Sequence, residues 1–421
     1  MEEDLLTATA CFLILCGDSR KRKRKCWVRP SLKKREKYGG KEILSDLKKD
    51  DVLLEHRTDG CFKNFLRMSS SDMEFLLQKI AAVIRKADTN CRKAIPPQER
   101  LAVTLRFLAT GDSYSSLMYL FKISKQAISK IVPEVCAALV NAIKDQVKMP
   151  KTAQEWETIT NGFSVLWNFP KCVGVMDGKH IAIQAPKNSG SDFFNYKTFF
   201  SIVLFGVMDA NYRFLYFHVG SQGRISDGGV FENTLSKKLL TRCKLNLPEY
   251  SSLPGREKLV PHVFLGDDAF PLSPNLLKPY PGAQDKGSPK RIFNYRLSRA
   301  RRISENVFGM LSSIFRIFRK PLLLEPETAE VVVLACIYLH NFLRNSSRSK
   351  NSYNPPGTYD GEDKDTGRVL EGSWRRETQS NTFTSYKKVA RNASTEAKDI
   401  RQEFADFFVT PLGMVPWQNN Y

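Results

Sequence analysis

Hydrophobic residues recur at helical spacing through the first third of the chain. The spacing predicts amphipathic helices between 42 and 90, where Ser71 or Asp72 could cap a helix with an apolar face. It then predicts three short helices in close succession between 95 and 145, the first opened by Pro97 and stopped by Gly111. The apolar face of the capped helix would consist of Phe75, Leu76, Ile80 and Val83.

The third of these short helices has a polar and basic outer face. Ser124 can cap it, with Ala127, Ile128 and Ile131 buried. Pro133 would end or kink it near the length that a major groove accommodates. The pattern predicts a helix-turn-helix that binds DNA, although an ordinary helical bundle would show the same spacing. The residues facing the groove would be Lys125, Gln126, Ser129 and Lys130.

Beyond a helix and connector over 146–170, the pattern changes to that of strands. Residues 171–184 predict one strand, and 199–220 predict two more joined by a tight turn at 209–211. Ser226 and Asp227 would cap a helix over 228–240, residues 261–270 supply a fourth strand, and a long helix begins near Ser298. This order predicts an α/β fold, an RNase H-like core in which a mixed sheet is flanked by helices.

Acidic residues occupy three settings in this core. Asp177 is the first polar residue on the buried stripe of its strand, the doublet Asp267-Asp268 follows the fourth strand, and Glu305 lies on the late helix. Hard divalent cations prefer oxygen ligands, and clustered carboxylates can hold two of them for phosphodiester cleavage. Taken singly, Asp177 could be a turn residue, either acid of the doublet could be the ligand, and Glu305 could be an exposed helical residue.

Basic side chains flank these acids and could contact phosphates. A guanidinium group can form two parallel hydrogen bonds to a phosphate, so Arg299 and Arg302 are candidate DNA contacts. Arg296, Arg301 and Lys179 lie near the same acids in the sequence. His180 fits a packed strand histidine at least as well as a catalytic one. Asp209 is best explained as a turn former and Asp227 as a helix cap.

Composition supports a partner with a phosphate backbone. The 421 residues carry 65 Lys and Arg against 44 Asp and Glu, a formal charge of +21. Nine scattered cysteines without a C-x-x-C pair indicate reduced thiols. Six consecutive basic residues over 20–25 are typical of a nuclear-import signal. They predict that the protein resides in the nucleus and also in the cytoplasm. The apolar segment 5–16 is too short to span a membrane, and no membrane partner is expected.

Several sequence segments, in the same order along the chain, resemble the nuclease domain of PIF/Harbinger transposases and of the cellular proteins derived from them. They are GVMDGKHIAIQAP, LGDDAFPLSPNLLKPYPG, FNYRLSRARRISENVFGMLSSIFRIF and ACIYLHNFLR, and the similarity spans about 95 to 345. The resemblance implies a metal-dependent DDE nuclease in which Asp177, Asp267 and Glu305 are catalytic and bind Mg²⁺ or Mn²⁺. Asp268 stands where the family is usually not acidic.

The resemblance also implies the partners and the domain plan. DNA is the substrate, strand transfer is a further reaction of the family, and a Myb-like DNA-binding protein commonly assists; homo-oligomerisation stays open. The alternative is a domesticated DNA-binding protein that recruits partners without catalysis. The expected parts are a basic N-terminal segment (1–41), a helical region with the helix-turn-helix (42–150), the RNase H-like DDE nuclease domain (151–345), a polar linker or loop (346–380), and a C-terminal helix and tail (381–421) anchored by Trp417.

Overall fold

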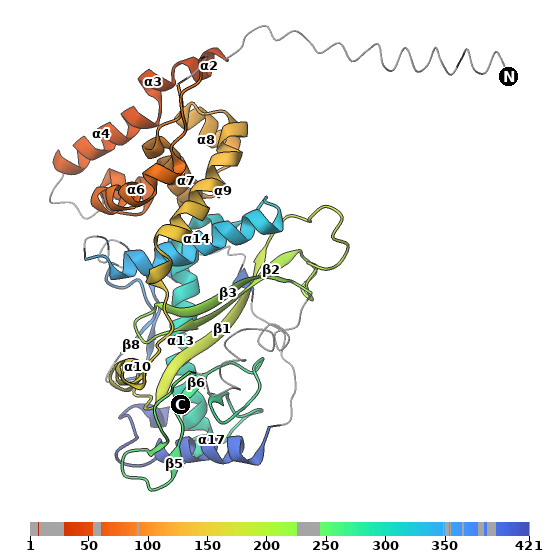
Figure 1. The fold of residues 1–421 in the computed structure, drawn as a ribbon. Helices are drawn as coiled ribbons and strands as arrows, with labels where there is room; N and C mark the ends of the chain where they lie inside the picture. Colours follow the sequence, from red (N-terminus) through yellow and green to blue (C-terminus); the bar gives the residue numbers. More distant parts are fainter. Residues whose placement is uncertain are drawn as a thin grey trace.

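The computed structural model describes residue 7 and residues 29–53, 60–90, 93–224, 245–347, 349, 353, 355–363, 366–377, 383–384 and 393–420. The basic run 20–25, most of the apolar segment 5–16 and the predicted helix over 228–240 with both caps lie outside these ranges. A helical region forms one end of the molecule and a mixed α/β region the other, with α14 (Pro326–Asn345) between them (Figure 1). No helix among the described residues is long and apolar enough to cross a membrane.

Among the described residues, the helical region begins with five helices, the last of which is α6 (Ser70–Ile84). Its cap is Ser69 rather than the predicted Ser71 or Asp72, because the Ser69 side chain accepts from the backbone N–H of Asp72. Phe75 and Val83 are 44% and 67% exposed, so the predicted apolar face is narrower than expected. The elements are α2 (Pro30–Lys33), α3 (Arg35–Tyr38), α4 (Gly40–Leu53), α5 (Cys61–Leu66) and α6 (Ser70–Ile84).

The three predicted short helices are present, and the third is longer than expected. Gly111 ends the first helix in the left-handed conformation (φ 66°), as its sequence position predicted. Pro133 does not end the third helix, which continues to Ala142 because the turns beyond the proline are buried. The elements are α7 (Pro97–Thr110), α8 (Tyr114–Phe121) and α9 (Lys125–Ala142), followed by the 3₁₀ helix η1 (Lys144–Gln146) and α10 (Ala153–Trp167).

The mixed sheet has the order β3-β2-β1-β6-β7. Antiparallel pairing joins β1 to β2 and β2 to β3, and parallel pairing joins β1 to β6 and β6 to β7. The two-residue strand β10 also pairs with β1, at His180 and Ile181. The strands are β1 (Cys172–Ala182), β2 (Ser201–Met208), β3 (Phe214–Gln222), β6 (Val263–Leu265), β7 (Leu276–Leu277) and β10 (Phe383–Thr384), with a separate pair formed by β4 (Ser251–Ser252) and β5 (Leu259–Val260).

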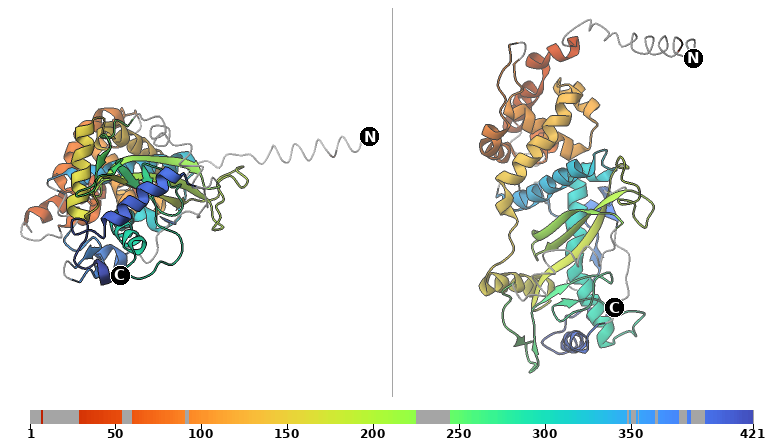
Figure 2. Two further views of the ribbon diagram at one scale, coloured as in Figure 1. Left: turned by 90° about the horizontal axis from the view of Figure 1, so that it is seen from below. Right: turned by 45° about the vertical axis from the view of Figure 1, so that its right-hand side comes forward.

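Helix α13 (Pro289–Ile314) lies along one face of the sheet (Figure 2). It begins nine residues before the predicted Ser298, capped by the Ser288 side chain, and the 3₁₀ helix η2 (Arg316–Arg319) follows it. Ile303 and Val307 on α13 share a core with Val175 and Ile181 on β1. A second core on the sheet includes Trp156, Val173, Met176, Phe205 and Phe264.

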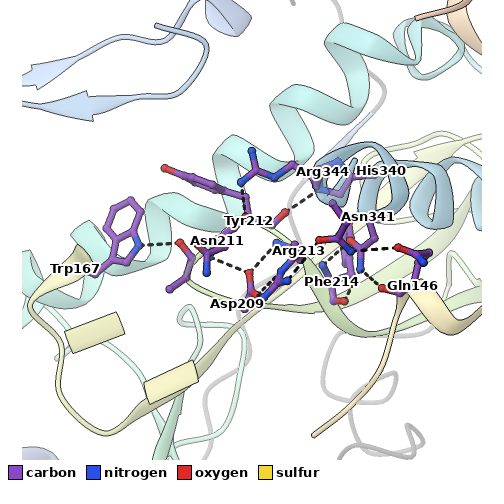
Figure 3. A network of polar contacts seen from close by, with 12 residues as sticks. Gln146, Trp167, Asp209, Asn211, Tyr212, Arg213, Phe214, His340, Asn341 and Arg344 are labelled. Atoms are coloured by element: carbon purple, nitrogen blue, oxygen red, sulfur yellow. Dashed lines mark hydrogen bonds and ion pairs between the residues drawn. The ribbon is translucent and has the colours of Figure 1, made fainter. Parts of the chain in front are cut away.

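Polar contacts of α14 join the sheet to the end of the helical region (Figure 3). The Asn341 amide donates to the carbonyls of Phe214 and Gln146, at 2.8 and 2.9 Å, and its oxygen accepts from the Phe214 N–H. In the β2–β3 turn, Asp209 accepts from the backbone N–H groups of Asn211 and Arg213, both at 2.9 Å. Asp209 is therefore the turn former that the sequence predicted.

The described parts of 346–380, which the sequence predicted as a polar linker or loop, pack against the long helix α13. Trp374 is buried there against Gly309, and Asp360 is 2% exposed. The sequence showed no sign of these buried contacts, because the apolar anchors of this segment are too few to form a periodic pattern. Its elements are β8 (Gly361–Glu362), β9 (Val369–Leu370) and α16 (Ser373–Glu377); α17 (Thr395–Phe407) and the 3₁₀ helix η3 (Gln418–Asn420) then complete the chain.

Candidate functional site

Asp177 lies within β1 rather than at its end. The strand continues for five residues beyond it to Ala182, so Asp177 is not a turn residue. Asp177 pairs with Gly206 of β2 and is 2% exposed. Its Oδ1 atom accepts from the backbone N–H of Gly178 at 2.8 Å, and Lys179 Nζ lies 3.1 Å from its Oδ2. The strand therefore holds a buried carboxylate with a cation beside it.

Asp267 lies two residues beyond the end of β6, after the strand as predicted, and strand register brings it beside Asp177. Val175 of β1 is the parallel partner of Leu265 in β6, and each aspartate lies two residues beyond its paired residue. Neighbouring strands are about 4.8 Å apart, so this register places the two carboxylates on adjacent backbones. The backbone N–H of Ala269 donates to Asp267 Oδ1 at 2.9 Å. Asp268, the other acid of the doublet, is half-buried.

The two aspartates have opposite pKa shifts. Burial raises the pKa of Asp177, but the charges of Lys179 and Arg301 outweigh burial and hold the pKa below its ordinary value. Burial and the nearby charge of Asp177 raise the pKa of Asp267, with Arg301 opposing them. Arg301 Nη2 lies 3.8 Å from Asp267 Oδ2. Lys179 and Arg301 thus compensate much of the charge of the pair, and the raised pKa of Asp267 indicates a remaining repulsion that a bound cation would relieve.

Glu305 does not complete a three-acid group in this structure. Its side chain is 54% exposed, and its Oε2 atom accepts from Arg375 Nη2 at 3.0 Å. The helix residues that affect the pKa values of the aspartates are Ser304 and Arg301, which lie about one turn or less before Glu305 on α13. Among the described residues, no three His, Cys, Asp or Glu side chains form a group that could hold a metal ion. The role of Glu305 as a metal ligand stays a prediction.

The arginines predicted to contact DNA are engaged inside the protein. Arg299 is 8% exposed; it donates to the Trp167 carbonyl and the Asn168 side chain and forms an ion pair with Glu362. Arg302 lies 3.9 Å from the same Glu362 carboxylate, with 12% of its side chain exposed. Both side chains thus have an internal partner in the buried acid of the packed segment 355–363, and their phosphate contacts stay a prediction.

Arg296 and His180 also have internal partners. Arg296 is 1% exposed and donates to the carbonyls of Gly413 and Asn168. His180 is buried with Nδ1 3.0 Å from the Ser201 hydroxyl, and burial and the charge of Lys197 lower its pKa to about 4. Alternation along β1 points His180 away from the face of Asp177. These contacts favour the packed strand histidine.

The predicted DNA-facing residues of α9 are all exposed: Lys125, Gln126, Ser129 and Lys130. Tyr119 on α8 is 66% exposed. Sequence reasoning did not single out Arg375, Asp360 or Glu362, which lie in the segment interpreted as a linker. No local pattern distinguishes such residues, because their partners are about 55 to 70 positions away in the chain.

Comparison with known proteins agrees with this fold. Residues 176–341 match the family model of the DDE superfamily endonucleases. The chain therefore carries a DDE superfamily endonuclease domain, and the mixed sheet with its flanking helices is consistent with that fold.

The chain is also similar to proteins derived from Harbinger transposases. It is 25% identical over 290 residues to "Protein ALP1-like" of Arabidopsis thaliana, which covers 67% of this chain and 70% of that protein. It is also 25% identical over 331 residues to the Mus musculus protein named "Putative nuclease HARBI1", covering 77% and 87%. No solved structure matches the chain.

Proposed function

We propose that this protein is a divalent-metal-dependent DNA endonuclease of the Harbinger transposase type, with an RNase H-like core. The observation that carries the proposal is the register of β1 and β6, which places Asp177 and Asp267 side by side. Two adjacent carboxylates are the kind of oxygen donor set that Mg²⁺ or Mn²⁺ prefers, and a bound cation would relieve the repulsion that helps to raise the pKa of Asp267. Glu305 is the third proposed ligand.

The residues of the site have separate tasks in this proposal. Bound Mg²⁺ or Mn²⁺ would activate a water and stabilise the leaving oxygen of the phosphodiester. Asp177 and Asp267 would hold the cation, with Asp177 already ionised because of Lys179 and Arg301. Arg301 and Lys179, with side chains 20% and 14% exposed, would then be available to a phosphate of the DNA backbone. Strand transfer would use the same site with a DNA 3′-hydroxyl in place of water.

The helical region is proposed to bind DNA as a helix-turn-helix. The exposed face of α9 carries Lys125 and Lys130 with short polar residues between them, and Tyr119 of α8 adds a hydroxyl donor. The formal charge of +21 supports a DNA partner. Residence in the nucleus is proposed from the basic run 20–25, and a Myb-like partner protein and homo-oligomerisation are proposed by resemblance to the family.

A second candidate function is DNA binding without catalysis. The observation that favours it is the ion pair of Glu305 with Arg375, which keeps the third acid out of the group. A protein of this kind would bind DNA through α9 and recruit partners through its helical region. The two candidates differ in one property, which is metal-dependent cleavage.

The test is nicking of supercoiled plasmid in Mg²⁺ or Mn²⁺. The parent should nick, and Asp177→Asn and Asp267→Asn should each lower the nicking rate by at least roughly 100-fold. Loss of a residue that only hydrogen-bonds to a metal ligand already costs up to about that much. Asp268→Asn is the matched control and should keep most activity. A parent that binds DNA but never nicks it would favour the second candidate, and loss of activity in Asp268→Asn would reassign the ligand of the doublet.

A further inference from the structure

The predicted third acid is held by a residue from outside the matched domain. Arg375 lies on α16, more than 30 residues beyond the match at 176–341. Its Nη2 atom donates to Glu305 Oε2 at 3.0 Å. The ion pair therefore joins the helix of the candidate site to a segment that packs on it from the C-terminal part of the chain.

Arg375 is fixed by Asp360 much more firmly than it is bound to Glu305. Its Nε donates to both carboxylate oxygens of Asp360, at 2.9 and 3.0 Å, and its Nη2 donates to one of them at 2.6 Å. The Asp360 side chain is fully buried and also accepts from the backbone N–H of Gly372 at 2.8 Å. Of the three side chains, Glu305 is the half-exposed one, so it can move while Arg375 stays in place.

The turn of α13 that follows Glu305 sets the position of Arg375. Asn306 Oδ1 accepts from the Asp360 N–H and from the Trp374 indole, both at 2.9 Å. Trp374 lies over Gly309, where a larger residue would not fit. Because Asn306 and Gly309 belong to the same helix as Glu305, the guanidinium is placed at a defined point beside that carboxylate.

We propose that Arg375 is a positioning residue for Glu305: it holds this carboxylate away from Asp177 and Asp267 until a divalent cation takes it over. The inference rests on the proposed nuclease function. The guanidinium is a unit positive charge at hydrogen-bonding distance, so it competes directly with a cation for the same oxygen. An exposed pair of this kind changes an equilibrium by a factor of up to about five, which a bound dication can overcome.

A merely structural ion pair makes a different prediction. It would add to the stability of α16 on α13, and its loss would change melting without changing metal affinity. A positioning role requires that removal of the Arg375 charge makes Mn²⁺ bind more tightly, and that this gain depends on Glu305. Metal affinity separates the two roles without any measurement of cleavage.

The experiment titrates Mn²⁺ into the full chain and follows free Mn²⁺ by electron paramagnetic resonance. Arg375→Gln should lower the Mn²⁺ concentration at half-saturation by about two- to five-fold. Arg376→Gln, with the same charge change on the same short helix, is the control and should leave it unchanged. In a Glu305→Gln background, Arg375→Gln should have no effect, as a double-mutant cycle requires for two coupled groups.

Three results would overturn the inference. They are unchanged or weaker Mn²⁺ binding in Arg375→Gln, the same gain in Arg376→Gln, or a gain that survives Glu305→Gln. Failure of the proposed function looks different, because the parent would then show no Mn²⁺ binding that Asp177→Asn removes. A double-mutant cycle of melting temperatures, measured on the same variants in EDTA, should show coupling between Arg375 and Glu305. It checks that the contact exists and that the variants fold.

Discussion

Lys179 Nζ lies 3.1 Å from Asp177 Oδ2, and the two side chains are two residues apart on one face of β1. The strand thus supplies both the buried acid and the cation that keeps it ionised. In a metal-free protein this pair and Arg301 offset the cost of burying the carboxylate. The arrangement makes the site stable before metal binds, and it leads to predictions about charge, pH and stability.

Lys179→Met should destabilise the metal-free protein by roughly 2 kcal/mol at pH 7, because a buried carboxylate loses a charged hydrogen-bond partner. The pKa of Asp177 is lowered in the folded state, so its contribution to stability is present above the unfolded value and is lost as pH falls through the folded value. The difference between parent and variant should therefore shrink in acid. Urea unfolding at pH 7 and in acid measures it, with the exposed Lys187→Met as control; an equal loss at both pH values would contradict the account.

Asp267→Asn should raise the melting temperature of the metal-free protein by about 2 °C near pH 7, a shift that corresponds to under 1 kcal/mol in a domain of this size. The pKa of Asp267 is raised in the folded state, so its ionisation costs stability, and the cost grows as pH rises from the unfolded value through the folded one. An amide keeps the acceptor for the Ala269 N–H and removes the charge. Melting in EDTA tests this, and a lower melting temperature than that of the parent would contradict it.

Much of the sheet was predictable from sequence because its strands are continuous apolar runs. β1, β2 and β3 match the predicted strands, and the Asp209 turn joins the last two as expected. The alternative that Asp177 is a turn residue was wrong, since Asp177 and Lys179 form an ion pair and can stay buried within β1. Local polarity alone cannot show that a buried acid has a partner two residues away.

The surroundings of the acids were harder to predict than the acids themselves. Register of β1 and β6 brings Asp177 and Asp267 together, which their positions on predicted strands had indicated. The burial of Arg299 depends instead on Glu362, and the engagement of Glu305 depends on Arg375. Both partners come from a polar segment without hydrophobic periodicity, so only the folded chain reveals them.

Charge reversal on α9 should weaken DNA binding if this helix contacts phosphates. Lys125→Glu or Lys130→Glu should each reduce the slope of log affinity against log salt by about one unit per lost phosphate contact. Both side chains are exposed, so folding should be unaffected. Fluorescence anisotropy across a salt series measures the slope, with the exposed Lys187→Glu as control. A slope that stays at the parent value would make the region a plain helical bundle.

His340 should make the protein less stable in mild acid. Its Nε2 atom lies 2.8 Å from the Tyr212 carbonyl, which can only accept, so Nε2 carries the proton and Nδ1 accepts from the Tyr353 hydroxyl at 2.8 Å. Burial and Arg344 lower its pKa to about 3, although the carbonyl favours the charged ring. Stability is then lost as pH falls below the unfolded value near 6.5, by about 1.4 kcal/mol per pH unit.

His340→Gln is the variant that tests this, since an amide can still donate to the Tyr212 carbonyl and does not titrate. Its free energy of unfolding should fall less steeply between pH 6.5 and pH 5 than that of the parent, even if it is lower at neutral pH. His180 remains in both proteins, with a pKa of about 4, and sets a common background slope. Parallel pH profiles would show that His340 is already charged in the folded protein.

Gly309→Ala should displace α16 from α13. A Cβ atom at this position would collide with the indole ring of Trp374, which is buried and donates to Asn306. Overpacking of this kind typically costs about 1–3 kcal/mol, and here the indole must leave its hydrogen bond as the helix shifts. Trp374→Phe, which keeps the ring and loses the donor, should cost less, about 1 kcal/mol. Urea unfolding compares the two, and hydrogen exchange over 355–377 should rise most in Gly309→Ala. If Gly309→Ala is as stable and as protected as the parent, the segment does not depend on Trp374 for its place on the helix.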